Sequence, residues 1–242
     1  MKKIFFALIA ISIVACSKNE TPKDTNVHIS GTIKGLSQGK LFLQKIEDTT
    51  LVVFDSIIFN GNDTFESHFK LESPEMIYLT LDRGQTTSVD NSLAFFAEPG
   101  NITIETTLKH FFADAKVKGS KNHDLWEEFK KINNRFNEEN LAIMEKRLKN
   151  ELKPNPETTD SIEKAYQKLV TRKYRYTAHF ATTHGNAEVA PYLALSDISD
   201  INMFYLDTIQ KSMKPEVAKS KYGKLLTKFV KERKDLEQKV TQ

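Results

Sequence analysis

The chain has one cysteine, Cys16, among its 242 residues. A disulfide within the chain is therefore impossible, and thiol–disulfide catalysis is excluded because it needs an attacking thiolate and usually a resolving partner. The sequence also lacks the Gly-x-Gly-x-x-Gly and Gly-x-x-x-x-Gly-Lys loops that bind phosphate groups. We expect no catalytic triad and no Gly-x-Ser-x-Gly nucleophile turn. We therefore expect no enzymatic activity, no catalytic residue and no cofactor.

A strong excess of charge of one sign is also missing. The chain has 35 Lys and Arg against 32 Asp and Glu, and removal of Lys2 and Lys3 leaves 33 basic residues, a net charge of +1. Nucleic-acid-binding proteins usually present a basic face. The segment 172–176 interleaves bases with aromatics, but on a helix we expect its Tyr rings to pack under the Lys and Arg stems. No nucleic-acid partner is expected.

The first fifteen residues have the layout of a secretory signal peptide. Lys2 and Lys3 precede an apolar run from Ile4 to Ala15, in which only Ser12 is polar. The run is too short to span a bilayer as a helix. It ends in Ile13-Val14-Ala15-Cys16, which resembles the lipobox of bacterial lipoproteins. The alternative is an ordinary secretory signal with an incidental cysteine.

The lipobox resemblance implies that residues 1–15 are cleaved and that Cys16 is lipidated as the first residue of the mature protein. Each buried acyl methylene contributes about 0.8 kcal/mol, so two or three chains hold a protein stably at the bilayer. Residues 16–26 are polar and form a flexible tether. We expect a cell-envelope protein anchored in the lipid bilayer. Because no Asp follows the cysteine, we expect the outer membrane, on either its periplasmic face or the cell surface.

Residues 27–118 show the apolar alternation of half-buried strands, with Gly- and Asn-rich turns between the runs. The stretch from Leu51 to Phe59 is apolar on both faces, which favours a central or doubly covered strand. Seven or eight short strands predict an antiparallel β sandwich or a partly open barrel. The alternating runs begin at Val27, Ile77, Leu93 and Ile102.

An ordered series of short motifs in this region resembles the family called domain of unknown function 4369. The motifs are Ile29-Ser30-Gly31-Thr32-Ile33, Leu41-Phe42-Leu43, Asp55-Ser56 with Gly61 and Phe65, Glu98-Pro99-Gly100-Asn101-Ile102, and Val117-Lys118-Gly119-Ser120 with Asn122. The resemblance implies a small β sandwich, usually found in lipoproteins ahead of a helical connector and a thioredoxin-like domain. We expect this chain to lack the thioredoxin-like domain, because it has no Cys-x-x-Cys.

From residue 119 the apolar spacing becomes helical. We expect a first helix with its stripe over residues 125–148, stopped by residues 153–156, and a second from Asp160 to His184. The spacing of Asp160 to Glu163 is that of a capping box. Shorter helices are expected over 187–195 and 201–212, and a last one after Pro215. The predicted fold class is therefore α+β, with an all-helical C-terminal domain over 119–237 and a frayed tail over 238–242.

The six histidines do not suggest a metal site by their spacing. His179 and His184 are five residues apart, about 140° around a helix, so they would not converge on one ion. The acidic pairs at 127–128 and 138–139 lie beside Lys and Arg on a helix face that we expect to be exposed. Solvated ion pairing is the common role of such groups. We expect no metal.

Two Phe-Phe pairs indicate a second packed surface on the β domain. If the local structure is strand, adjacent side chains point to opposite faces, so one ring of Phe95-Phe96 and one of Phe111-Phe112 must cover something besides the sandwich core. The helical region is the expected neighbour, and another chain or a ligand are the alternatives.

These observations favour a non-enzymatic, membrane-anchored lipoprotein that serves as a binding or spacing module, with a possible protein partner in the envelope. One alternative is an accessory protein to a separately encoded thioredoxin-like thiol-disulfide oxidoreductase. Another is a small-ligand carrier with an apolar pocket between sheet and helices.

Overall fold

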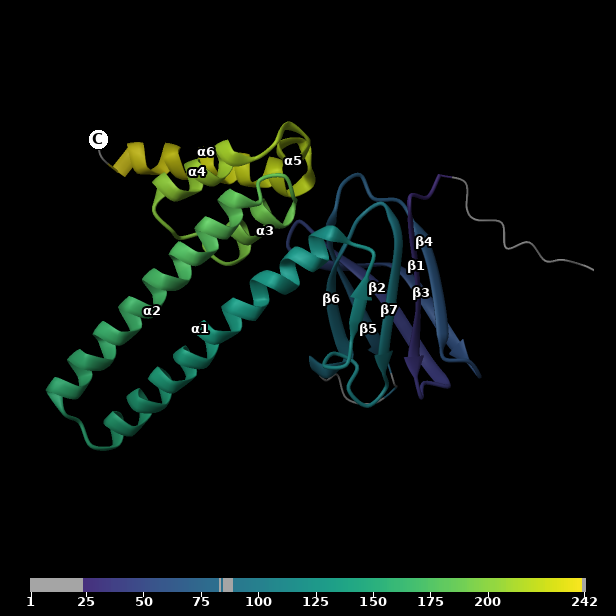
Figure 1. Cartoon of the computed structure of the whole chain (residues 1–242), viewed down its shortest axis with the longest axis horizontal. Coiled ribbons are helices and arrows are strands. Elements are labelled where there is room, and N and C mark those ends of the chain that lie inside the picture. Colours follow the sequence, from purple (N-terminus) through teal and green to yellow (C-terminus); the bar gives the residue numbers. More distant parts are fainter. Residues whose placement is uncertain (1–23, 83, 85–88, 241–242) are drawn as a thin grey trace, which may run out of the picture.

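The computed structural model describes residues 24–82, 84 and 89–240. The expected signal peptide, Cys16 and residues 17–23 of the expected tether lie outside the described residues. The described chain consists of two β-sheets followed by helices (Figure 1), which confirms the predicted α+β class.

The two sheets form an open sandwich of eight described strands. One sheet has the order β4-β1-β7-β8 and the other β3-β2-β5-β6, and they do not close into a barrel. Neighbouring strands are antiparallel except β1 and β7, which are parallel. The strands are β1 (Val27–Lys34), β2 (Gln38–Glu47), β3 (Thr50–Asn60), β4 (Thr64–Phe69), β5 (Glu75–Asp82), β6 (Ser92–Ala97), β7 (Gly100–Thr107) and β8 (Lys116–Lys118).

The alternating apolar residues fill the space between the two sheets. Ile29 and Ile33 on β1 face Leu41, Leu43 and other residues of the second sheet, and all of them are buried. Burial of one such aliphatic side chain contributes about 1.5–3 kcal/mol. Gly31 leaves room for its two neighbours in the same sheet, because a Cβ there would lie 2.3 Å from the Ile104 carbonyl oxygen on β7 and 2.5 Å from the Phe65 ring on β4.

The prediction that residues 51–59 form a central or doubly covered strand was wrong. They belong to β3, which lies at the edge of its sheet and pairs only with β2. Phe59 faces the core, but Leu51, Val53 and Ile58 are exposed on the other face. An apolar run therefore does not distinguish a covered face from an exposed one. This edge presents apolar side chains to solvent.

In the described residues, six α-helices follow the sandwich, and a short 3-10 helix, η1 (Val89–Asn91), lies between β5 and β6. α1 and α2 form an antiparallel hairpin that extends away from the sandwich, and the shorter helices pack around the returning end of α2 (Figure 1). No described helix has both the length and the apolar character needed to cross a membrane. The helices are α1 (Lys121–Leu152), α2 (Pro156–Thr183), α3 (Val189–Ser196), α4 (Met203–Ser212), α5 (Pro215–Lys219) and α6 (Lys221–Val240).

Two helix boundaries differ from the prediction. α2 begins at Pro156 rather than Asp160, because the Asn155 side chain accepts a hydrogen bond from the Thr158 amide and Pro156 occupies the first helical position. The expected single helix after Pro215 is divided into α5 and α6 at Ser220. α6 then continues to Val240, three residues past the expected end of the helical domain.

A separate hydrophobic cluster joins the sandwich to the helices. Phe96 on β6 is fully buried and packs edge-on against the rings of Trp126, Tyr192 and Tyr222. The Tyr222 hydroxyl also accepts a hydrogen bond from the Met76 amide at 3.0 Å. The helical region is thus the neighbour expected for one ring of the Phe95-Phe96 pair. The same prediction was wrong for Phe111-Phe112, which lie in a turn rather than a strand: Phe111 is buried in the sandwich core and Phe112 is exposed.

Candidate functional site

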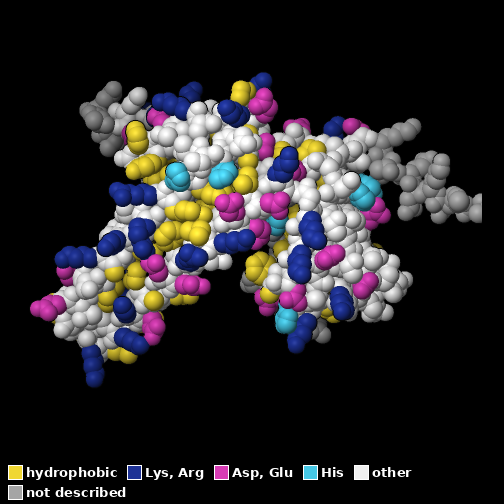
Figure 2. Space-filling view, in the orientation of Figure 1, with side chains coloured by type: hydrophobic (Ala, Val, Ile, Leu, Met, Phe, Trp, Pro, Cys, Tyr) yellow, Lys and Arg dark blue, Asp and Glu magenta, His cyan; other side chains and the backbone are white. Residues whose placement is uncertain are grey.

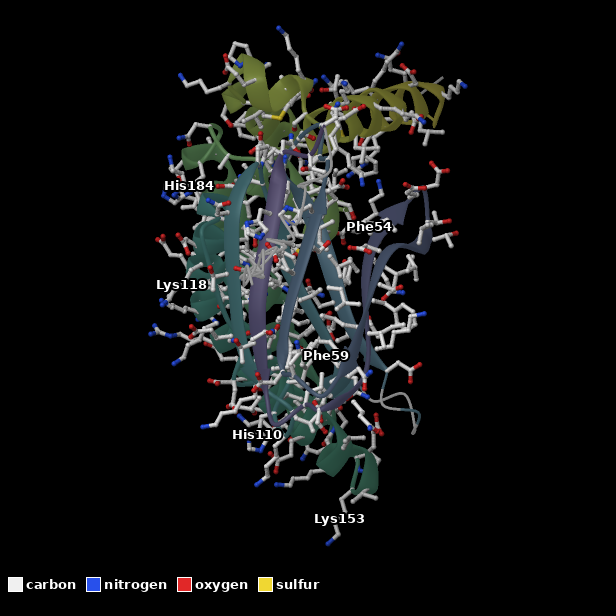
Figure 3. All side chains as sticks on the ribbon, turned by 90° about the vertical axis from the view of Figure 1, so that its right-hand side faces the viewer. Phe54, Phe59, His110, Lys118, Lys153 and His184 are labelled. Atoms are coloured by element: carbon white, nitrogen blue, oxygen red, sulfur yellow. The ribbon has the colours of Figure 1, made fainter. Side chains whose placement is uncertain are left out.

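Two histidines and a glutamate meet on the outer face of the β4-β1-β7-β8 sheet. Val27 and Ile29 point into the core, so His28 between them points outward. His28 pairs in register with His68 on β4, and Glu66 precedes His68 by two residues on the same face. Figure 3 views this face of the sandwich, with β1 between β4 and β7.

The three side chains are in direct contact. The two imidazole rings stack, with centroids 4.3 Å apart and planes 5° from parallel. The Glu66 Oε1 atom lies 2.5 Å from His28 Nε2 and 3.2 Å from His68 Nε2. One carboxylate oxygen and one nitrogen from each ring all lie within 4.8 Å of one another. Both imidazoles are partly exposed, and Glu66 is half exposed.

The Nε2 atom of His28 is buried and has no hydrogen-bond partner. The Glu66 carboxylate is close enough to this nitrogen for an ion pair. The angles at the contact are not those of a hydrogen bond, so the nitrogen still lacks a hydrogen-bond partner. Buried polar atoms in proteins usually have a partner, and an exception calls for an explanation.

A shallow depression of about 400 Å³ opens over this cluster. Asn26, Gly100 and Asn101 border it beside the two histidines. Asn26 is held in place because its side chain donates to the Leu71 carbonyl and accepts from the Leu71 amide, both at 2.8 Å. The last residue of the expected tether is therefore fixed to the sandwich.

Two imidazole nitrogens and a carboxylate oxygen are ligand types that Zn²⁺ and related divalent ions bind in proteins. Three protein ligands leave further coordination positions for water or another ligand. The side chains of the cluster arise from hydrogen-bonded strands, which restrict their backbone positions. Among the residues that the structure describes, this is the one group of three or more potential metal ligands.

The other histidines have different surroundings. His110 lies 3.5 Å from Asp114, and the His184 Nδ1 atom lies 2.8 Å from the Phe180 carbonyl. His179 is exposed. His123 is buried in the first turn of α1, where burial lowers the pKa of its imidazole.

Two of the candidate acids form ion pairs, and the two tyrosines of segment 172–176 contact an aromatic ring and a carboxylate. Glu127 pairs with Lys130 at 2.5 Å, and Glu139 pairs with Arg172 across the hairpin. The Tyr176 ring stacks on Phe129, and the Tyr174 hydroxyl donates to Asp200 at 2.7 Å. Burial raises the pKa of Tyr174 to about 12.

The expectation that the sequence has no Gly-x-Ser-x-Gly pattern was wrong, because residues 35–39 read Gly-Leu-Ser-Gln-Gly. In α/β-hydrolases this turn lies between a strand and a helix and holds the serine over the sheet. Here it joins β1 to β2, and Ser37 is exposed on a strand-to-strand connection. The segment therefore does not have the structural context of a catalytic turn.

A polar network connects the sandwich to the helices beside the Phe96 cluster. The buried Asn122 side chain donates to Glu98 at 2.9 Å and to Glu188 at 3.0 Å, and it accepts from the Val189 amide at 2.9 Å. Glu98 also accepts from the Lys121 amide at the start of α1. These bonds fix the position of the first helical turn against the sheet.

The histidine cluster could not be found from helical spacing, because His28 and His68 are forty residues apart in the chain. A usable signal was present: each histidine alternates with core residues, and Glu66 and His68 share one strand face. What the sequence does not specify is that β1 and β4 are neighbours with these two residues in register.

Comparison with protein families gives one match, to the family whose motifs the sequence resembles. The model of the family described as "Domain of unknown function (DUF4369)" matches residues 27–126, which comprise the sandwich and the first residues of α1. No curated protein matches the chain, and no solved structure matches it.

Proposed function

We propose that this chain, whose sandwich matches a domain of unknown function, is a non-enzymatic lipoprotein of the cell envelope. Acylated Cys16 anchors it in the bilayer, in the outer membrane, and the sandwich with its helical domain forms a module that binds a protein partner and holds it at a distance from the anchor. The sequence of residues 1–16 supports the anchor. The shape and surface of the α1–α2 hairpin support the binding role.

The observation that carries the binding role is an uncovered apolar stripe on the far half of α1. The stripe consists of Leu141, Met144, Leu148 and Leu152, whose side chains are between 50% and 83% exposed. Figure 2 shows hydrophobic side chains on the hairpin surface among Lys, Arg and acidic residues. The spacing of three and four residues places all four on one side of the helix.

The stripe does not face α2. Ile143 borders the groove between α1 and α2 together with Leu169. Leu148 follows Ile143 by five residues, which corresponds to about 140° around the helix. The stripe therefore lies on the outer side of the hairpin, where a second helix can pack against it.

The partner that fits this surface is an amphipathic helix of another envelope protein. An apolar row at intervals of three and four residues is the surface that packs in helix pairs, with each side chain between those of the facing helix. Charged residues beside the row, including Glu145 and Lys149, would border such a helix and help to set its orientation.

The fixed junction supports the spacing role. Asn122, Glu98 and Phe96 connect the base of α1 to the sandwich through buried contacts. A helix rises about 1.5 Å per residue, so the 32-residue α1 spans about 48 Å. A partner held at the hairpin tip would stand several nanometres from the sandwich.

Metabolic labelling with a fatty-acid analogue tests the anchor. The full-length chain should incorporate the label, and Cys16→Ser should not. Absence of label on the unsubstituted protein would contradict membrane anchoring through this residue.

A photo-crosslinking amino acid at position 148 tests the binding role in intact cells. We expect a discrete crosslinked species from position 148 and none from position 164, an exposed site on α2. The disruptive variant is Met144→Glu, which places a charge in the middle of the stripe and should abolish the position-148 crosslink. Equal crosslinking from both positions, or none from either, would contradict a partner on the stripe.

A further inference from the structure

We propose that His28, Glu66 and His68 form a binding site for one divalent transition-metal ion, with Zn²⁺ as the reference ion. The site lies on the outer face of the sandwich, away from the α1 stripe, and the proposal does not depend on the anchor or on a protein partner.

The positions of the ligand atoms support this assignment. In a tetrahedral zinc site with bonds of about 2.0–2.1 Å, neighbouring ligand atoms lie about 3.3 Å apart. The Glu66 oxygen is 3.2 Å from His68 Nε2 and 2.5 Å from His28 Nε2, and all the ligand atoms fall within 4.8 Å. Shifts of about 1 Å, which side-chain rotation can supply, would bring the three atoms to coordinating distances.

The local backbone favours a preformed site. His28 and His68 are directly opposite each other on hydrogen-bonded strands, and the imidazoles already stack. β1 is also paired with β7 on its other side, so the backbone of His28 is held by a neighbouring strand on each side. Ligands on strands lose less freedom on binding an ion than ligands on mobile loops.

The unpartnered nitrogen is an independent indication of a ligand. His28 Nε2 is buried and lacks a hydrogen bond, yet it lies beside a carboxylate oxygen. An ion bound by both atoms, after they separate to about 3.3 Å, would give the nitrogen a partner. The half-exposed Glu66 supplies one negative charge to offset part of the charge of a divalent ion.

The remaining coordination positions face the depression bordered by Asn26 and Asn101. Asn101 is opposite His28 on β7, in the same cross-strand row as His68. Water can therefore complete the coordination shell. The site as built from the described residues has three protein ligands rather than four.

Metal titration of the full-length chain tests the proposal. The protein should be purified in detergent through a tag without histidines, stripped with a chelator and titrated with Zn²⁺ by calorimetry. We expect one ion per chain. Glu66→Gln, which keeps the size of the side chain, and His68→Ala should each weaken binding at least about 10-fold, since even the loss of groups that support a ligand costs 10–100-fold.

The matched control is His110→Ala, because His110 is also an exposed histidine of the sandwich beside a carboxylate. This variant should bind Zn²⁺ as the unsubstituted chain does. Circular dichroism of every variant shows whether it is folded. As a second readout, Zn²⁺ should shift the ¹⁵N resonances of the His28 and His68 rings and leave that of His110 unchanged.

Three results would overturn the proposal. The first is that the chain does not bind Zn²⁺ stoichiometrically. The second is that the Glu66→Gln and His68→Ala variants bind Zn²⁺ as tightly as the unsubstituted protein. The third is that the ring resonances of His28 and His68 do not respond to Zn²⁺. In each case Glu66 is only an ion-pair partner of the two imidazoles.

Discussion

Phe95 and Phe96 are consecutive on β6, and their rings belong to two different hydrophobic clusters. Phe95 lies between the sheets of the sandwich, whereas Phe96 lies among aromatic rings of the helical domain. Both side chains are completely buried. A single strand therefore contributes to the sandwich core on one face and to the contact between the domains on the other.

Substitution of Phe96 by Ala should lower the free energy of unfolding by about 3–5 kcal/mol, because it removes a fully buried ring and leaves a cavity. Urea unfolding followed by circular dichroism measures the change. The control is Phe112→Ala, since Phe112 is exposed and its loss should change the free energy by no more than about 0.5 kcal/mol. Similar effects of the two substitutions would contradict a covered Phe96.

Asn122→Ala should destabilise the protein by about 1–3 kcal/mol. The substitution removes bonds to both Glu98 and Glu188 and leaves the buried Val189 amide without an acceptor. Asn137→Ala, at an exposed position of the same helix, should have little effect or a slightly stabilising one. The comparison fails if the two variants unfold at the same urea concentration.

The start of α2 can be tested with two substitutions five residues apart. Asn155→Ala should cost about 1 kcal/mol of local stability and increase amide hydrogen exchange in the first turn of α2, because it removes the cap on Thr158. Asp160→Ala removes only an exposed ion pair with Lys164, worth about 0–1 kcal/mol. Faster exchange in the Asp160 variant alone would place the helix start where the sequence suggested.

Stability should decrease as the pH falls below 6.5, in part because of His123. Burial lowers the pKa of this imidazole from its ordinary value of 6.5, so between the two values the unfolded state binds more protons than the folded state. The stabilisation is complete above pH 6.5 and is lost as the pH falls through the lowered pKa. Urea unfolding between pH 7.5 and 5 should show a weaker pH dependence for His123→Gln. An identical dependence would exclude this contribution.

The main features of the fold could be predicted because apolar residues recur along the chain with the period of a strand or of a helix. Ile29 and Ile33 alternate with polar residues, and Phe129 lies on a helical stripe, so each residue indicates its element and the face that is buried. The prediction that Leu148 belongs to the same stripe was wrong, because Leu148 is exposed on the outer side of α1. Near the hairpin tip, an apolar residue in the sequence does not show whether another part of the chain packs against it.

The candidate site depended on information that local patterns do not contain. Alternation shows that His28 and His68 point away from the core, but their contact depends on which strands become neighbours and in which register. The same limit affected β3, whose apolar residues resemble those of an interior strand although the strand lies at an edge. Pairing between distant strands is decided by the whole sandwich.

The position of β1 affects how the folded chain withstands mechanical load. The described chain enters the sandwich through Asn26, and β1 follows at once with β4 bonded to one side and β7 to the other. Tension transmitted from the N-terminal side therefore meets two ladders of hydrogen bonds rather than one. Extracting this strand would disrupt both ladders and expose Val27, Ile29 and Ile33 to water, so the sandwich should resist pulling from that end better than an edge strand would.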